Sequence, residues 1–371
     1  MVSALTLFAI GFLVSITLMF VLRPIALRIG LVDMPGGRKT HSGEVPVIGG
    51  LAMFSALLVA SLAGVIETGL AAPLLAASGL MVVVGMLDDL FDLPPNVRLL
   101  AHIAAAATLV LATGLTVSNL GDLVGLGELR LRFLAWPFTV VAAIALINAF
   151  NMLDGMDGLA GGVGLVALAG FAWAFAQAGH WPASAFSTAI LGAVLAFLVF
   201  NVPAGFNRGV LAFMGDAGST LLGFLLAGLG LAAVQPNPHA MDPIVMLWLM
   251  PIPIFELFVS TFRRLFKGRS PLKADRGHFH HALLKAGFSV RAIFVTYLVV
   301  SILMAVAGLI GSAHGVGEPV LFFGFVAAGT IWIIGVRNAH AIAIRLPRHL
   351  RRGLTPGVVA PVTNTASSDS G

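Results

Sequence analysis

The chain has 371 residues, of which 58% are hydrophobic and only 10% are charged. Together with a mean hydropathy of +1.01, this composition excludes an ordinary soluble domain and predicts a protein that crosses a membrane several times. The formal net charge is +5, and the absence of cysteine excludes disulfides and thiolate metal sites.

Apolar runs divide the sequence into eleven predicted membrane-spanning helices, since one span needs about 20 apolar residues. In chain order these spans cover residues 3–22, 46–66, 70–87, 97–114, 133–150, 158–177, 184–201, 211–233, 241–262, 291–312 and 317–336. The predicted fold is an all-α polytopic membrane domain over residues 1–340, followed by a basic and then disordered tail over residues 341–371. Within the segment 115–132, the alternating residues from Glu128 to Phe133 favour a small β-hairpin.

The basic residues are distributed unevenly between the two sides of these spans. If the N-terminus lies outside, 19 of the 21 Lys and Arg residues fall on or beside inner segments, and only Arg130 and Arg132 lie outside. Positive charge accumulates on cytoplasmic loops, so the C-terminus is predicted to be cytoplasmic and the 115–132 hairpin to lie outside. The polar motifs also gather at the inner face, which favours a single site there.

Three carboxylates, those of Asp88, Asp89 and Asp92, end the third predicted span. Adjacent acids repel one another unless a cation or a proton relieves the repulsion, which favours a divalent metal site or a general base. The alternative is that they are solvated loop acids that cap the next helix, whose first turn follows Pro94.

The segment from Asn148 to Asp157 has polar residues in three-residue steps, at Asn148, Asn151, Asp154 and Asp157. If the helix continued, these side chains would share one edge, whereas the nearby glycines favour a turn. Such oxygen donors suit Mg²⁺ or a ribose, although capping between two spans is the simpler alternative. Before another long span, Phe213 offers a face on which a base could stack, and Asp216 is either a metal ligand or a helix cap.

The largest inner loop is basic, and it ends in His278, His280 and His281. For its early basic residues, Arg263 to Lys273, membrane topology or attraction to anionic lipid explains the charge as well as a functional role does. The three histidines favour phosphate binding over Zn²⁺, because the other candidate ligands are hard oxygens. Lys39 lies in a glycine-rich basic loop that also suits an anion, although it lacks the P-loop spacing. Four isolated histidines are interpreted as structural: His102, His180, His239 and His314.

These groups together would bind a nucleotide-activated substrate beside the bilayer, with Mg²⁺ and a lipid phosphate as the second substrate. The alternative from another class is a cation- or proton-coupled transporter, in which intramembrane acids mark an ion path. A transporter predicts acids distributed through the membrane depth, whereas here they gather at one face.

Four motifs resemble those of the polyprenyl-phosphate N-acetylhexosamine-1-phosphate transferases, in the same order and over most of the chain up to about residue 340. They are Gly85–Asp92, Asn148–Gly162, Phe213–Ser219 and Ser270–His281. The His-x-His-His pattern is most similar to the bacterial branch that transfers GlcNAc-1-phosphate to undecaprenyl phosphate, and differs from the MurNAc-pentapeptide branch.

The resemblance implies that UDP-GlcNAc and undecaprenyl phosphate give undecaprenyl-diphosphate-GlcNAc and UMP, with Mg²⁺ or, as a substitute, Mn²⁺. It implies catalytic roles for Asp88 and Asp89 near the lipid phosphate, and metal ligation by Asn151 and Asp216. The residues that it implies for substrate binding are Asn148, Asp154, Asp157, Phe213, Arg276, His278, His280 and His281, with Lys39 and Arg98 as weaker phosphate contacts.

Further expectations follow from the same resemblance. The enzyme would be a multi-pass protein of the bacterial plasma membrane, with its site on the cytoplasmic face. It would catalyse the first membrane step of an envelope polysaccharide such as O-antigen, and it would not bind nucleic acid. The oligomeric state stays open, and a homodimer is one of the alternatives. Another UDP-N-acetylhexosamine donor stays open, as do direct attack and a covalent aspartyl intermediate. One position departs from the family, because Glu256 stands where an Asp is usual.

Overall fold

The structure is a computed structural model, and it describes residues 3–34, 43–64, 68–202, 209–235, 239–268, 278–339 and 341. Helices dominate because hydrocarbon offers no partners to backbone N–H and C=O groups, which must therefore bond within each segment. In chain order the helices are α1 (Ala4–Ile29), α2 (Gly49–Leu62), α3 (Thr68–Phe91), α4 (Pro95–Thr113), α5 (Ala135–Leu153), α6 (Leu159–Gln177), α7 (Trp181–Asn201), α8 (Gly215–Ala233), α9 (Pro243–Leu249), α10 (Pro251–Phe266), α11 (Phe279–Ala286), α12 (Val290–Ala313) and α13 (Glu318–Arg337), with a 3-10 turn at Arg132–Leu134.

Within the described residues, nine helices are long and apolar enough to cross a membrane. They coincide with nine of the eleven predicted spans, and the all-α polytopic character is confirmed. The predicted span 46–66 contains only the 14-residue helix α2, which is about 21 Å long at 1.5 Å per residue. The predicted span 241–262 is two helices, α9 and α10, that meet at an angle of 91°. By length and composition, the described residues thus contain nine candidate spans, or ten if the bent pair counts as one.

The bend between α9 and α10 falls at Met250, whose backbone leaves the helical region at φ −128° and ψ 48°. Pro251 begins α10, and Pro253 follows two residues later. Neither proline can donate a backbone hydrogen bond to the preceding turn, so the hydrogen-bond ladder of α9 is weakened here and a break is favoured. The bend redirects α10 and brings one of its faces to the polar pocket described below.

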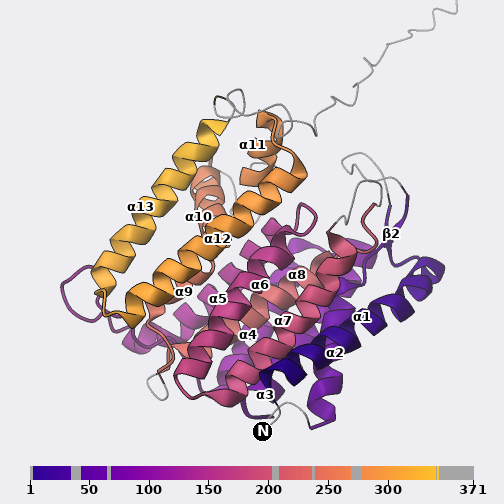
Figure 1. The fold of residues 1–371 in the computed structure, drawn as a ribbon, viewed down its shortest axis with the longest axis horizontal. Helices are drawn as coiled ribbons and strands as arrows, with labels where there is room; N and C mark the ends of the chain where they lie inside the picture. Colours follow the sequence, from indigo (N-terminus) through magenta and orange to yellow (C-terminus); the bar gives the residue numbers. More distant parts are fainter. Residues whose placement is uncertain are drawn as a thin grey trace, which may run out of the picture.

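Helix α8 is the centre of the bundle, and Figure 1 shows it among α2, α3, α5, α6 and α7. Of its 18-residue apolar window, 83% is buried, compared with 22% for α1 and α13. Close packing at its N-terminus depends on glycine, because a Cβ on Gly218 would lie 2.8 Å from the backbone nitrogen of Gly50. A Cβ on Gly85 would collide with the backbone of Ala217. Small residues thereby let α2 and α3 approach the end of α8 that carries the polar residues.

Two short β features accompany the helices. The strands β1 (Val32–Asp33) and β2 (Val45–Pro46) pair antiparallel, and the residue after β2, Val47, forms a bridge with Phe213. The hairpin predicted within 115–132 is reduced to one antiparallel bridge between Asn119 and Arg130, with neighbouring backbone hydrogen bonds. Glu318 at the start of α13 accepts from the backbone of Asp122 and ties this loop to the last helix.

Candidate active site

A pocket of about 560 Å³ lies between α3, α4, α5, α8 and α10, beside His278. One wall is apolar and includes Met81, Val141 and Leu257. The other wall combines acids, amides and cations. Its charged and polar members are Asp88, Arg98, His102, Asn148, Asn151, Asp154, Asp216, Thr220, Thr261, Arg264 and His278. Seven of the fourteen residues predicted for the site therefore line one cavity.

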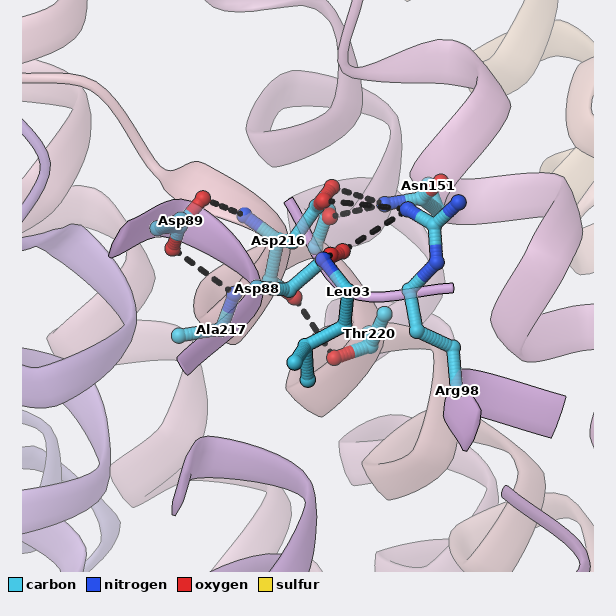
Figure 2. Close-up of polar contacts among 9 residues, drawn as sticks. Asp88, Asp89, Leu93, Arg98, Asn151, Asp216, Ala217 and Thr220 are labelled. Carbon is cyan, nitrogen blue, oxygen red and sulfur yellow. Dashed lines mark hydrogen bonds and ion pairs between the residues drawn. The ribbon is translucent and has the colours of Figure 1, made fainter. Parts of the chain in front are cut away.

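Asp88 reaches the pocket because α3 ends just beyond it. Asp92 adopts a left-handed φ of 50°, which turns the chain back, so that the backbone N–H of Leu93 donates to Asp88 Oδ1 at 2.7 Å. Arg98, in the first turn of α4, donates to Asp88 Oδ2 at 2.7 Å. Asp88 is only 5% exposed, and both of its oxygens are engaged (Figure 2). A buried carboxylate needs such partners, since an unpaired charge is costly to desolvate.

The same guanidinium nitrogen of Arg98 lies 3.5 Å from Oδ2 of Asp216, so that two carboxylates share one cation. Asp216 belongs to the first turn of α8, and its Oδ1 accepts from Nδ2 of Asn151 at 2.6 Å. The Asn151 amide also donates to Ser219 Oγ at 3.0 Å. Figure 2 shows these side chains of α3, α4, α5 and α8 converging on one point.

Asp89 points elsewhere than its neighbour. Its Oδ1 accepts from the backbone N–H of Asp216 at 2.9 Å, and its Oδ2 accepts from that of Ala217 at 3.3 Å. Helix α8 has no capping side chain of its own, because Met214 occupies the N-cap position. Asp89 therefore supplies the cap from α3, where its negative charge also meets the positive end of the helix dipole. Its contacts in the structure position Asp216, and a chemical role for Asp89 stays a prediction.

The polar edge predicted from Asn148 to Asp157 is shorter than a continuous helix would make it. Helix α5 ends at Leu153, and a turn leads to Gly158, whose φ of 76° is left-handed. Asn148 and Asp154 line the pocket, whereas Asp157 does not. Burial, followed by the charges of neighbouring carboxylates, raises the pKa of Asp154 well above its ordinary value, although part of its surface still faces the cavity. Those neighbours are Asp216, Asp89 and Asp157.

The histidine motif lies at the start of α11 and packs against α10. Nδ1 of His278 lies 3.3 Å from Oε2 of Glu256, and Nδ1 of His280 lies 3.5 Å from Oε1. His278 lines the pocket, whereas His280 is fully buried behind it. Burial, with the charges of the two neighbouring histidines, lowers the pKa of His281 from 6.5 to about 4, so that this ring is neutral at pH 7.

Other predicted residues lie outside the cavity. Phe213 does not line it, and its backbone instead bonds to Pro46 and Gly49 beside β2. Because Phe213 is not among the residues that line this pocket, its predicted role in stacking a base stays a prediction. Lys39 and Arg276 fall outside the described residues.

Several polar residues of the site were not singled out from the sequence. His102, interpreted as structural, lines the pocket and is only 7% exposed, and its Nδ1 has no hydrogen-bond partner in the described part of the chain. Its spacing of four residues from Arg98 was the available signal, because such residues share a helix face. Arg264 belongs to the basic run for which topology and a functional role were equal alternatives, and it is buried and also lines the pocket. Ser219 contacts Asn151 without any distinguishing sequence pattern.

The donor set fits a hard divalent cation, because it consists of carboxylate, amide and hydroxyl oxygens. Burial and, after it, the charges of neighbouring carboxylates raise the pKa of Asp154, and a cation relieves the repulsion between such carboxylates. No group of three or more His, Cys, Asp or Glu residues in the described segments is arranged as a ready metal site. In this structure Asn151 turns its Nδ2 toward Asp216, so that ligation by both requires the amide to turn over.

The fold and the pocket define an integral-membrane protein whose polar cavity suits a ligand that carries phosphate. Comparison with known proteins makes the class specific. The sequence model of glycosyl transferase family 4 matches residues 71–234. The undecaprenyl-phosphate alpha-N-acetylglucosaminyl 1-phosphate transferase of Yersinia pestis is 34% identical over 92% of this chain and 93% of its own length. The proteins of the same name from Haemophilus influenzae and Escherichia coli (strain K12) are 34% and 33% identical, over 92% of this chain in each case and over 97% and 94% of their own lengths. The chain therefore belongs to glycosyl transferase family 4, and it is a transferase.

Proposed function

We propose that the protein transfers GlcNAc-1-phosphate from UDP-GlcNAc to undecaprenyl phosphate, giving undecaprenyl-diphosphate-GlcNAc and UMP. The relatives are named as transferases of N-acetylglucosaminyl 1-phosphate that act on undecaprenyl phosphate. Their sequences align with nearly the whole of this chain. The structural observation that carries the proposal is the single cavity with one apolar wall and one charged wall. A polyprenyl chain fits the apolar wall, while the phosphates of both substrates require the charged wall.

In the proposed reaction, an oxygen of the lipid phosphate attacks the β-phosphorus of UDP-GlcNAc. A new P–O bond forms there, and the bond from this phosphorus to the bridging oxygen breaks, so that UMP leaves with that oxygen. A phosphate monoester is largely ionised at pH 7, with a second pKa of about 6, so little help from a general base is needed. Arg98, Arg264 and His278 would hold phosphate oxygens on the charged wall.

The contacts of Asp88 favour a positioning role, because its carboxylate binds Leu93 and orients Arg98. A covalent route instead has a carboxylate oxygen of Asp88 attack the β-phosphorus while UMP leaves with the bridging oxygen. An oxygen of the lipid phosphate then attacks the same phosphorus, and the bond from phosphorus to Asp88 breaks. The family generally requires a divalent metal ion. We propose Mg²⁺ held by Asp216 and Asn151; when bound, it would neutralise charge on the diphosphate and on the departing UMP.

We also propose that residues 1–340 form one membrane domain whose pocket opens to the cytoplasm across a bacterial plasma membrane. Support comes from the basic sequence that begins at Arg263 and ends at Arg276, because Arg264 and His278 at its two ends line the pocket and positive charge accumulates on cytoplasmic loops. UDP-sugars are soluble, so a cytoplasmic opening lets the donor enter from water while the lipid enters from the bilayer. The homodimer alternative and the particular envelope polysaccharide stay predictions from the sequence.

Release of UMP from purified protein tests the function directly. The assay contains detergent, undecaprenyl phosphate and radiolabelled UDP-GlcNAc, with and without Mg²⁺. UDP-GalNAc in a parallel reaction measures donor choice. We expect Mg²⁺-dependent UMP release that requires the lipid phosphate and is fastest with UDP-GlcNAc. No release with either UDP-sugar would refute the transferase, whereas faster release with UDP-GalNAc would refute only the donor.

A further inference from the structure

Helix α10 has a buried polar stripe in an otherwise apolar environment. Glu256, Ser260 and Arg264 are spaced four residues apart and therefore share one face. Their exposed fractions are 1%, 2% and 6%, whereas Phe258 and Phe262 on the same helix are more than half exposed. The stripe leads to the pocket, which Arg264 lines. A polar stripe is retained inside a membrane protein only where its groups have partners.

The carboxylate of Glu256 contacts polar groups from α12 and from the start of α11. Tyr297 of α12 donates its hydroxyl to Oε1 at 3.0 Å, and His280 Nδ1 lies 3.5 Å from the same oxygen. The other oxygen, Oε2, lies 3.3 Å from Nδ1 of His278. Ser260 Oγ adds a contact of 3.4 Å to that same ring nitrogen. Oε2 makes no hydrogen bond within the described residues, so its relation to His278 is that of a charge 3.3 Å away. A carboxylate at this distance favours an N–H over a bare nitrogen and thereby constrains the ring.

We propose that Glu256 is a positioning residue that holds His278 for the donor phosphates. Its Oε2 faces Nδ1 and favours a proton on that nitrogen, which leaves Nε2, on the far side of the ring, for the pocket. In the proposed complex the ring is protonated at both nitrogens, so that Nδ1 faces the carboxylate while Nε2 donates to a phosphate oxygen. The inference rests on the proposed function, since it assigns His278 to the UDP-sugar.

His280 packs between Glu256 and the turn after α5, and it thereby helps to set the position of His278. It is fully buried, and a Cβ on Gly155 would lie 2.8 Å from its Nε2. The ring thus packs directly on the turn after α5, which also carries Asp154 of the pocket wall. Glu256 thereby connects α10, α11 and this turn, so that His278 has a defined position relative to the acids.

The decisive variant is Glu256→Gln. It preserves the size of the side chain and an acceptor for Tyr297, but it presents an amide N–H to His278. That N–H favours a bare Nδ1, so the ring that contacts phosphate would lose its second proton and with it the positive charge that Glu256 balances. We expect kcat/KM for UDP-GlcNAc to fall about 10- to 100-fold, the usual cost of losing a partner that orients a functional histidine. KM for UDP-GlcNAc should rise, whereas KM for undecaprenyl phosphate should stay unchanged.

Two further variants separate positioning from a general packing defect. Glu256→Asp keeps the charge on a shorter side chain, so it should retain more activity than the Gln variant while still raising KM for the donor. Ser301→Ala is the matched control, because Ser301 is buried on α12 and its Oγ has no partner within the described chain. This control should have wild-type kinetics. If Glu256→Gln does not fold, the Asp variant alone decides, since only a positioning role raises KM selectively for the donor.

A double-variant cycle identifies the residue through which Glu256 acts. In a His278→Gln background, Glu256→Gln should have little further effect on kcat/KM, since the ring that it orients is already absent. A full additional loss, or an equal rise in KM for both substrates, would overturn the inference. The wild-type reaction keeps the two proposals distinct: absent UMP release refutes the function, whereas normal release with indifferent Glu256 variants refutes only the positioning role.

Discussion

Substitution of Asp89 separates a capping role from a chemical one. Its two oxygens accept the backbone N–H groups of Asp216 and Ala217, at 2.9 and 3.3 Å. Asp89→Ala removes both acceptors at a helix end that has no other cap. Asp89→Asn preserves the shape and one acceptor oxygen, but it removes the charge and replaces the second acceptor with a donor.

The expected cost follows from these two contacts. A hydrogen bond to a charged acceptor contributes about 1.5–3 kcal/mol, and a buried N–H left unpaired costs about 1–3 kcal/mol. These two figures describe the same contacts and are not summed. We expect Asp89→Ala to lower the free energy of unfolding by about 2–3 kcal/mol. Asp89→Asn, which mainly loses the charge at the helix dipole, should lower it by about 1 kcal/mol.

The turnover of each Asp89 variant should depend on how far the substitution displaces Asp216. A misplacement of about 1 Å in a catalytic group costs about 100-fold, so Asp89→Ala should lose turnover by about that factor. Asp89→Asn should retain a substantial fraction. Asp88→Asn is the matched comparison, since the adjacent carboxylate faces the pocket, and its loss of turnover should not be accompanied by loss of the α8 cap.

Thermal unfolding in detergent measures the stability, and UMP release measures the turnover. If Asp89 acts as a cap, Asp89→Ala should lose more stability than Asp89→Asn, and it should also lose more turnover. It is refuted if Asp89→Asn abolishes turnover while its unfolding temperature equals that of the wild type. Such a result would assign the Asp89 carboxylate to the chemistry.

Three other substitutions test local features by thermal unfolding. Because the pKa of Asp154 is raised, the folded state binds this proton more tightly than the unfolded state, and stability falls as pH rises through the folded pKa. Asp154→Asn should therefore unfold at a higher temperature than the wild type at pH 8 but not near pH 4; equal differences at both would contradict this. The pKa of His281 is lowered to about 4, so stability should fall as pH drops from 6.5, and His281→Gln should lose less stability between pH 7 and 5 than the wild type. Gly215 has a φ of 72°, and its Cβ would lie 2.6 Å from Asp89 Oδ2, so Gly215→Ala should cost at least about 1–2 kcal/mol; an unchanged unfolding temperature would contradict the strain.

Nine of the predicted spans correspond to helices that are long and apolar enough to cross a membrane. They could be predicted because a helix that contacts lipid must be apolar along its length. The α9–α10 bend could have been expected from Pro251 and Pro253, but a window of apolar residues does not register a break in direction. The short helix α2 also shows that an apolar run need not be helical throughout. Proline chemistry accounts for the first case, and hydropathy alone predicts neither.

The acids of the site could be placed at one face from the sequence, but their orientations could not. Adjacent residues on a helix point about 100° apart, at 3.6 residues per turn, so Asp88 and Asp89 cannot face the same neighbours. Which one faces the pocket depends on how α3 is rotated against α8, and a single sequence does not encode that rotation visibly. For the same reason, Glu256 could be recognised as a departure from the family, while its histidine partners, close in sequence to the basic loop, could not be assigned to it.

The acidic and the basic groups of the site are both required for it to bind phosphate. A helix N-terminus ordinarily attracts phosphate, but that of α8 already holds the carboxylates of Asp89 and Asp216. A phosphate brought to this end would be repelled unless positive charge lay between them. Arg98 supplies one such charge and contacts both Asp88 and Asp216. A diphosphate adds more negative charge than this one shared guanidinium offsets. The acids on α3, α5 and α8 therefore suit a divalent cation, while Arg264 and His278 can contact phosphate oxygens from the opposite side.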